Sequence, residues 1–246
     1  MSDPGTLRRS IDSLYESETI TSDGGREFRL RIGVTREQGQ AIRDLVFSCG
    51  AVRSLETGFG LGFSALWICD ALLASGDPNA THVAMDPIQK ERFDDVGLKI
   101  VRDAGVADMV RLHRQPSSLV LPRLVQEALD AGSRLEYGVG SVNAFDVAFI
   151  DGAHHFENAF LDIYYAFMLV RPEGLIIVDD EWMPAVRHAI AYFEANMGFE
   201  RLPSPIDTPK RRRMLRRDDE GFIRMAVLRR PSAGLERDWD HFVPFA

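Results

Sequence analysis

Short apolar runs alternate with amphipathic stretches over most of this chain, and that alternation constrains its fold most strongly. Apolar runs of about four to eight residues bounded by turns are typical of strands, and apolar residues at helical spacing are typical of helices. Parallel strands need long crossovers, so strands that alternate with helices predict a parallel sheet. The strand candidates are residues 52–56, 82–86, 110–113, 145–150, 175–178, 199–202 and 222–229. The helical patterns are residues 7–17, 35–48, 63–73, 89–104, 118–131, 156–170 and 184–196.

This order predicts an α/β fold, with a Rossmann-like, seven-stranded, mostly parallel sheet and helices on both faces. The last two strand candidates have no helical pattern between them, so we expect an antiparallel C-terminal hairpin at one sheet edge. A length of 246 residues suits one large α/β domain. We expect residues 1–48 to form N-terminal helices packing on a core of residues 49–246, within a single globular domain overall.

Composition narrows the classes of partner. Acidic residues outnumber basic ones, 37 to 29, which disfavours broad binding to nucleic acid. The two cysteines lack metal-ligand spacing, and the sequence shows neither a leader pattern nor an apolar run long enough to span a bilayer. We therefore expect a soluble, cytoplasmic protein that binds small molecules, with no membrane partner; a homodimer through the polar N-terminal helix stays open.

The stretch SLETGFGLGFSALW, residues 54–67, places three alternate glycines between a strand candidate and a helical pattern. In open α/β sheets, ligands bind where the first strand turns into its helix, and glycines let a ligand approach the backbone. Glu56 precedes this turn, and Asp86 ends the next strand, where an acid can accept both hydroxyls of a ribose. Two carboxylates beside a nucleoside site suit a positively charged nucleoside such as S-adenosylmethionine.

Two other interpretations of the turn exist. Phe63 stands where the dinucleotide fingerprint G-x-G-x-x-G needs a small residue, which disfavours a nicotinamide cofactor. Glycines at such a turn also serve packing alone.

The same stretch resembles motif I of the class I S-adenosylmethionine-dependent methyltransferases, and more narrowly the small-molecule O-methyltransferases related to catechol O-methyltransferase and its bacterial relatives. The likeness runs from about residue 32 to residue 180, and Gln38-Gly39-Gln40 resembles the K-G-Q segment of that family. It implies that Val34, Gly58 and Gly60 pack against the cofactor, Glu56 and Ser64 hold the amino and carboxylate ends of its methionine part, Asp86 binds the ribose and Ser117 contacts the adenine.

Three further acids follow strand candidates. Asp151 comes after residues 145–150, and Asp179 and Asp180 come after residues 175–178. Neighbouring parallel strands bring these carboxylates to one sheet edge, where they repel one another unless a proton or cation joins them. Oxygen ligands favour Mg²⁺, and metal-dependent members of the resembling family carry acids at these positions. Alternatively, the Asp179-Asp180 pair caps a helix.

The predicted reaction is methyl transfer to a hydroxyl of a small molecule, an aromatic or a natural-product sugar, with Mg²⁺ lowering the pKa of that hydroxyl. His154 titrates near neutrality and is the candidate base, with His155 as the alternative. Asp151 is also placed among the cofactor-binding residues. In the alternative of a metal-independent methyltransferase, Asp151 or His154 acts as the base on an oxygen or nitrogen atom. A protein that binds S-adenosylmethionine without catalysis is a further alternative.

The basic run PKRRRMLRR, residues 209–217, lies between the last two strand candidates. Such runs are usually solvated loops, although this one stands where it can cover a cleft or contact an acidic substrate or RNA.

Overall fold

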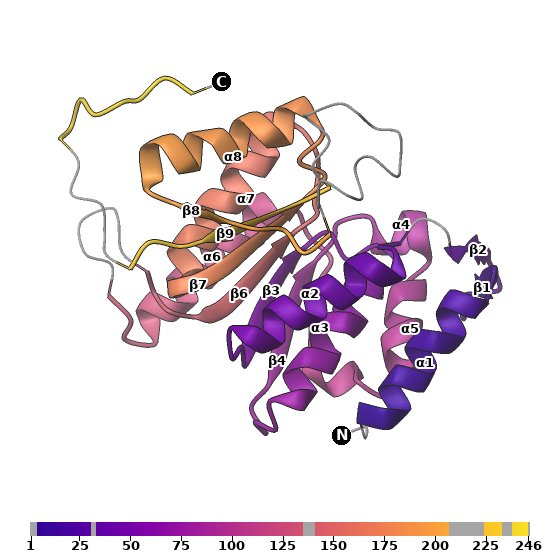
Figure 1. The fold of residues 1–246 in the computed structure, drawn as a ribbon. Helices are drawn as coiled ribbons and strands as arrows, with labels where there is room; N and C mark the ends of the chain where they lie inside the picture. Colours follow the sequence, from indigo (N-terminus) through magenta and orange to yellow (C-terminus); the bar gives the residue numbers. More distant parts are fainter. Residues whose placement is uncertain (1–3, 31–32, 135–140, 207–223, 233–237, 246) are drawn as a thin grey trace. The chain divides into compact units, whose positions relative to one another are not determined.

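The structure, a computed structural model, describes residues 4–30, 33–134, 141–206, 224–232 and 238–245. The chain forms two compact units, residues 1–117 and 118–246 (Figure 1). Strands β3 to β9 belong to the Rossmann-like, mostly parallel, seven-stranded sheet that the alternation predicts, so the expected fold class is confirmed. The basic run 209–217 lies outside the described residues.

Unit 1 holds the N-terminal helices and three parallel strands. Its helices are α1 (Pro4–Glu16), α2 (Arg36–Ser48), α3 (Phe63–Ala74), α4 (Gln89–Phe93) and α5 (Val96–Asp103). A small antiparallel hairpin joins β1 (Thr19–Thr21) and β2 (Glu27–Arg29), and the parallel strands are β3 (Arg53–Thr57), β4 (Thr81–Met85) and β5 (Val110–His113). β4 lies between β3 and β5, so the carboxyl ends of β3 and β4 meet at one edge.

Two helix starts in unit 1 follow from local sequence. Thr35 caps α2, because its side chain accepts a hydrogen bond from the backbone N–H of Gln38 at 3.2 Å. Gly62 caps α3 in the left-handed conformation, with φ of 76°, which glycine adopts without a steric penalty. α3 is buried from Phe63 to Leu72 and contacts α1, α2 and α5, which fits its mostly apolar sequence.

The helix predicted over residues 89–104 is wrong as one element. The structure breaks it into α4 and α5 at Asp94 and Asp95, which have positive φ of 47° and 57°. Aspartate tolerates this conformation better than most residues. The Asp94 carboxylate is held there by Ser22 Oγ at 2.6 Å and by Lys90 Nζ at 3.2 Å.

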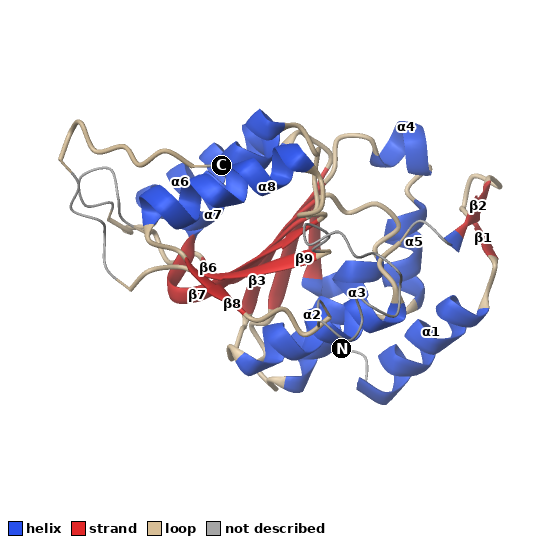
Figure 2. Ribbon diagram, turned by 45° about the horizontal axis from the view of Figure 1, so that its top comes forward, coloured by secondary structure: helices blue, strands red, loops and turns tan. Residues whose placement is uncertain are grey.

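Unit 2 carries the rest of the sheet, and α6 (Ser117–Asp130) begins at the boundary. Its other elements are β6 (Phe145–Ile150), α7 (Phe156–Leu169), β7 (Val170–Asp179), α8 (Pro184–Met197), β8 (Glu200–Leu202) and β9 (Met225–Arg229). β6 and β7 are parallel, and β9 pairs antiparallel with both β7 and β8, which gives the predicted C-terminal hairpin (Figure 2). All six residues of β6 are buried, as expected for a strand covered on both faces.

None of the described helices is long and apolar enough to cross a membrane.

Candidate functional site

The glycine turn of unit 1 adopts backbone conformations that favour glycine. Gly58, Gly60 and Gly62 have φ of 83°, 49° and 76°. A Cβ on Gly62 would lie 3.2 Å from the carbonyl oxygen of Gly97, so this glycine serves close packing. A Cβ on Gly60 would meet nothing within 4 Å, so Gly60 faces open space where a ligand can approach the backbone.

Asp86 lies beside that opening, as predicted. Its carboxylate is 4% exposed and accepts three hydrogen bonds at 2.9 Å, from the backbone N–H groups of Gly60 and Ile88 and from Gln89 Nε2. An ionised carboxylate offers about four acceptor sites, so capacity for a ligand hydroxyl remains.

Gln89 is a residue that the sequence did not single out. Its Nε2 also donates to the carbonyl oxygen of Gly60 at 2.6 Å, so one side chain ties the glycine turn to Asp86. Its Oε1 is buried and has no hydrogen-bond partner in the part of the chain that the structure describes. A buried acceptor without a donor is costly, and a bound molecule with N–H or O–H groups would satisfy it.

Glu56, near the end of β3, is fully buried and takes part in a network of side-chain hydrogen bonds. Ser64 Oγ donates to Glu56 Oε1, and His82 Nε2 lies 2.8 Å from Glu56 Oε2. His82 Nδ1 lies in turn 2.8 Å from Ser54 Oγ. The Ser64 hydroxyl therefore contacts Glu56 in this structure, and its predicted contact with a ligand stays a prediction.

The other predicted donor-site residues of unit 1 are Val34 and Ser117. Val34 is buried, and its carbonyl oxygen accepts a hydrogen bond from the Tyr15 hydroxyl at 2.8 Å. Ser117 is partly exposed at the first turn of α6. The open face of Gly60, the buried carboxylates and the unpartnered Gln89 oxygen fit a nucleoside with positive charge.

The acids of unit 2 meet at one sheet edge, as the spacing predicts. The register pairs Ile150 with Val178, so Asp151 and Asp179 follow paired residues on neighbouring strands. Asp180 is the next residue, and its φ of 55° is unusual for a residue other than glycine. The indole N–H of Trp182 donates to Asp180 Oδ1 at 2.8 Å, which supports this strained conformation.

Two cations of the chain already contact these acids. Arg224, immediately before β9, places Nη2 3.2 Å from Asp179 Oδ2 and Nη1 2.8 Å from Asp180 Oδ1. His154 Nε2 lies 3.2 Å from Asp180 Oδ2 and 3.7 Å from Asp151 Oδ1. Arg224 is a further residue that the sequence did not single out.

These contacts shift the protonation of the group. The nearby carboxylates of Asp151 and Asp180 raise the pKa of His154 to about 10, so its imidazole is protonated at neutral pH. Burial, and then the nearby charge of Asp151, raise the pKa of Asp179 to about 8. Burial alone would raise the pKa of Asp180, but the nearby His154 imidazolium and the Arg224 charge together hold it below its ordinary value.

Among the described residues, Asp151, His154 and Asp180 place ligand atoms within 4.8 Å of one another, which is a spacing that a metal ion can bridge. Their carboxylate oxygens are the donors that Mg²⁺ prefers. Asp179, which the sequence placed in the metal site, lies 3.2 Å from Arg224 Nη2 and is not in this group. The donor type therefore fits a divalent cation, and Arg224 already supplies one positive charge.

His155, the alternative base, lies elsewhere. It is the N-cap residue of α7, it is exposed, and its side chain forms no capping hydrogen bond. His154 is thus the histidine of this pair that contacts the acids.

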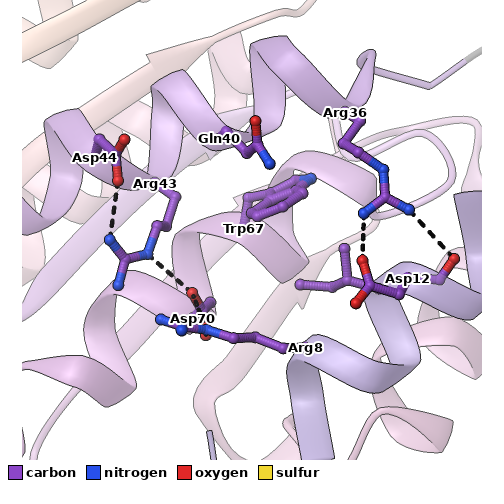
Figure 3. Close-up of a pocket in the computed structure, with 9 residues that line it drawn as sticks. Arg8, Asp12, Arg36, Gln40, Arg43, Asp44, Trp67 and Asp70 are labelled. Carbon is purple, nitrogen blue, oxygen red and sulfur yellow. Dashed lines mark hydrogen bonds and ion pairs between the residues drawn. The ribbon is translucent and has the colours of Figure 1, made fainter. Parts of the chain in front are cut away.

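A pocket of about 400 Å³ lies in unit 1 among α1, α2 and α3 (Figure 3). Arg8 and Arg43 hold the buried carboxylate of Asp70, at 3.1 and 2.9 Å, and Arg36 pairs with Asp12. These guanidinium groups are neutralised within the chain, and the lining includes none of the predicted site residues.

Comparison with known proteins agrees with these features. A family model described as a methyltransferase domain matches residues 55–181, which is just over half of the chain. Caffeoyl-CoA O-methyltransferase 2 of Zea mays is 31% identical over 179 residues, covering 72% of this chain and 59% of that protein. Catechol O-methyltransferase of Niastella koreensis is 28% identical over 149 residues, covering 61% of this chain and 58% of that protein. The chain thus spans less than two thirds of these relatives.

A solved structure shares the fold. The O-methyltransferase TomG from Streptomyces achromogenes, crystallised in complex with S-adenosylmethionine, matches with a TM-score of 0.57 and 18% identity. The match covers 94% of this chain and 91% of that one.

Proposed function

The chain belongs to the methyltransferase-domain family, and we propose that it transfers a methyl group from S-adenosylmethionine to a hydroxyl of a small molecule, an aromatic or a natural-product sugar. The observation that carries this proposal is the open Gly60 backbone beside two buried carboxylates, Asp86 and Glu56. The relatives named as caffeoyl-CoA and catechol O-methyltransferases support an oxygen atom as the acceptor.

The donor supplies an electrophilic methyl on a sulfonium, and the residues of unit 1 bind and orient it. Asp86 accepts the ribose hydroxyls, and Gln89 keeps the glycine turn beside it. Glu56 attracts the ammonium group, because a buried carboxylate interacts strongly with a cation. The first-turn N–H groups of α3, including that of Ser64, suit the methionine carboxylate. Val34, Gly58 and Ser117 complete the contacts.

The acids of unit 2 handle the substrate hydroxyl. Mg²⁺, when bound, supplies Lewis acidity that lowers the pKa of this hydroxyl, and Asp151, Asp179 and Asp180 are the residues that would hold it. His154 is protonated while it pairs with Asp151 and Asp180, and it becomes a base only after another positive charge replaces its proton. Until then the Asp151 carboxylate is the better acceptor for the hydroxyl proton, and it is also among the residues expected to contact the donor.

A metal-independent methyltransferase is a second candidate, and Arg224 specifically favours it. Its guanidinium contacts Asp179 and Asp180, two of the three acids assigned to the metal. Here the chain's own cations balance the acids, and Asp151 receives the proton.

The test is methyl transfer from radiolabelled S-adenosylmethionine to a panel of catechols, hydroxycinnamoyl thioesters and hydroxylated sugars. Activity that disappears with a chelator and returns with Mg²⁺ supports the metal-assisted reaction, and activity that persists in chelator supports the second candidate. Tight donor binding without turnover on any acceptor would instead indicate a protein that binds S-adenosylmethionine without catalysis.

A further inference from the structure

We propose that His82 is a positioning residue that orients the Glu56 carboxylate toward the ammonium group of the methyl donor. This inference rests on the proposed function, because it takes Glu56 as the ammonium-binding residue. It adds a residue that no part of the resemblance assigns.

The strand register brings the three side chains together. Ser54 and Glu56 are two residues apart on β3, so their side chains point to the same face of the sheet. His82 on β4 is the register partner of Ser54 and extends between them. Its two ring nitrogens lie 2.8 Å from Ser54 Oγ and 2.8 Å from Glu56 Oε2.

Because these three side chains are buried, the Glu56 carboxylate depends on protein groups for its hydrogen bonds. Ser54, Glu56 and His82 are each 0% exposed, so water does not compensate the carboxylate charge. A buried carboxylate requires hydrogen-bond donors, and Glu56 receives one from Ser64 Oγ and one from His82 Nε2. An ionised Glu56 only accepts hydrogen bonds, so the proton between the two residues belongs to His82 Nε2.

The two donors approach different oxygens and fix the plane of the carboxylate. About two acceptor sites then remain for a ligand. If the His82 donor is removed, the Glu56 carboxylate can turn toward Ser64. This change weakens its attraction for an ammonium group, whereas the ribose and adenine contacts are unaffected.

The test compares two nucleosides that differ in the amino-acid part. S-adenosylhomocysteine carries the ammonium group, and 5′-methylthioadenosine lacks it. Calorimetric titration of wild-type protein, His82→Leu and His82→Gln measures the affinity for each. Leucine removes the donor, whereas the glutamine amide keeps an N–H near the position of Nε2.

We expect His82→Leu to lose about tenfold in affinity for S-adenosylhomocysteine, as for one hydrogen bond to a charged group. His82→Gln should recover most of that loss, and the affinity for 5′-methylthioadenosine should stay unchanged in both. Ser54→Ala removes the hydroxyl that contacts His82 Nδ1, and it should produce a smaller loss of affinity for S-adenosylhomocysteine, again without a change for 5′-methylthioadenosine. This variant replaces His82→Leu in the test if His82→Leu does not fold.

Equal losses for the two nucleosides, or unchanged affinity for S-adenosylhomocysteine in His82→Leu or Ser54→Ala, would overturn the role of His82. Failure of the proposed function has a different signature. In that case the wild-type protein binds neither nucleoside, or Glu56→Gln leaves the affinity for S-adenosylhomocysteine unchanged.

Discussion

Replacing Arg224 by glutamine tests whether this cation competes with a metal for the acids of unit 2. The guanidinium contacts Asp180 at 2.8 Å and Asp179 at 3.2 Å. A divalent ion about 4 Å from the guanidinium would be repelled by about 2 kcal/mol even at the dielectric constant of water. Removing Arg224 should therefore tighten metal binding by about 30-fold.

The assay is titration with Mn²⁺, followed by the electron paramagnetic resonance signal of the free ion, with Mg²⁺ as competitor. Arg229→Gln is the matched control, because Arg229 ends the strand β9 that Arg224 immediately precedes and its side chain is 39% exposed, against 38% for Arg224. It pairs with Glu200 at 2.8 Å, outside the acid group. We expect tighter Mn²⁺ binding in Arg224→Gln alone. If Arg224→Gln binds Mn²⁺ no better than wild type, Arg224 does not compete with the metal.

The remaining predictions concern the donor site and pH. Asp86→Ala should weaken S-adenosylhomocysteine binding by one or two charge-assisted hydrogen bonds, roughly 1.5 to 3 kcal/mol each, and unchanged calorimetric affinity would remove Asp86 from the site. Gly60→Ala and Gly76→Ala both place a methyl in open space at positive φ, of 49° and 72°, so both should lose about 1 kcal/mol of stability, but only Gly60→Ala should bind the donor more weakly. Raised pKa values mean that the folded protein holds extra protons, on Asp179 from the ordinary 3.8 up to about 8 and on His154 from 6.5 up to about 10. The stability that these protons supply is therefore lost as pH rises through these ranges, by up to about 1.4 kcal/mol per pH unit per proton. The melting temperature should fall between about pH 6.5 and 9, and less steeply in Asp179→Asn; a rise over this range would contradict the pKa assignments.

The alternation of strand and helix patterns along the sequence predicted most of the fold. The strand at 145–150 lies where its apolar run predicts it, because burial on both faces leaves a continuous apolar stretch. The hairpin of β1 and β2 was not predicted, since three-residue strands are too short for a periodic signal. The break at Asp94 and Asp95 was also missed, because the contact that holds Asp94 comes from Ser22, 72 residues away in the chain.

The sequence likewise predicted some residues of the candidate site and missed others. Acids at strand ends are visible in sequence because the sheet edge gathers them, and the structure places Asp151, Asp179 and Asp180 there. Arg224 lies 45 residues from Asp179 along the chain, so no local pattern reveals the pair. His82 was given no function, although a histidine inside an apolar strand, next to the strand that carries Glu56, is the available signal.

The central claim is that the turn around Gly60 binds S-adenosylmethionine, and direct calorimetric titration with S-adenosylmethionine and, separately, with NAD tests it most directly. The account predicts saturable binding of S-adenosylmethionine at one site per chain and no heat of binding with NAD. Folded protein that binds NAD, or that takes up no S-adenosylmethionine, would contradict it.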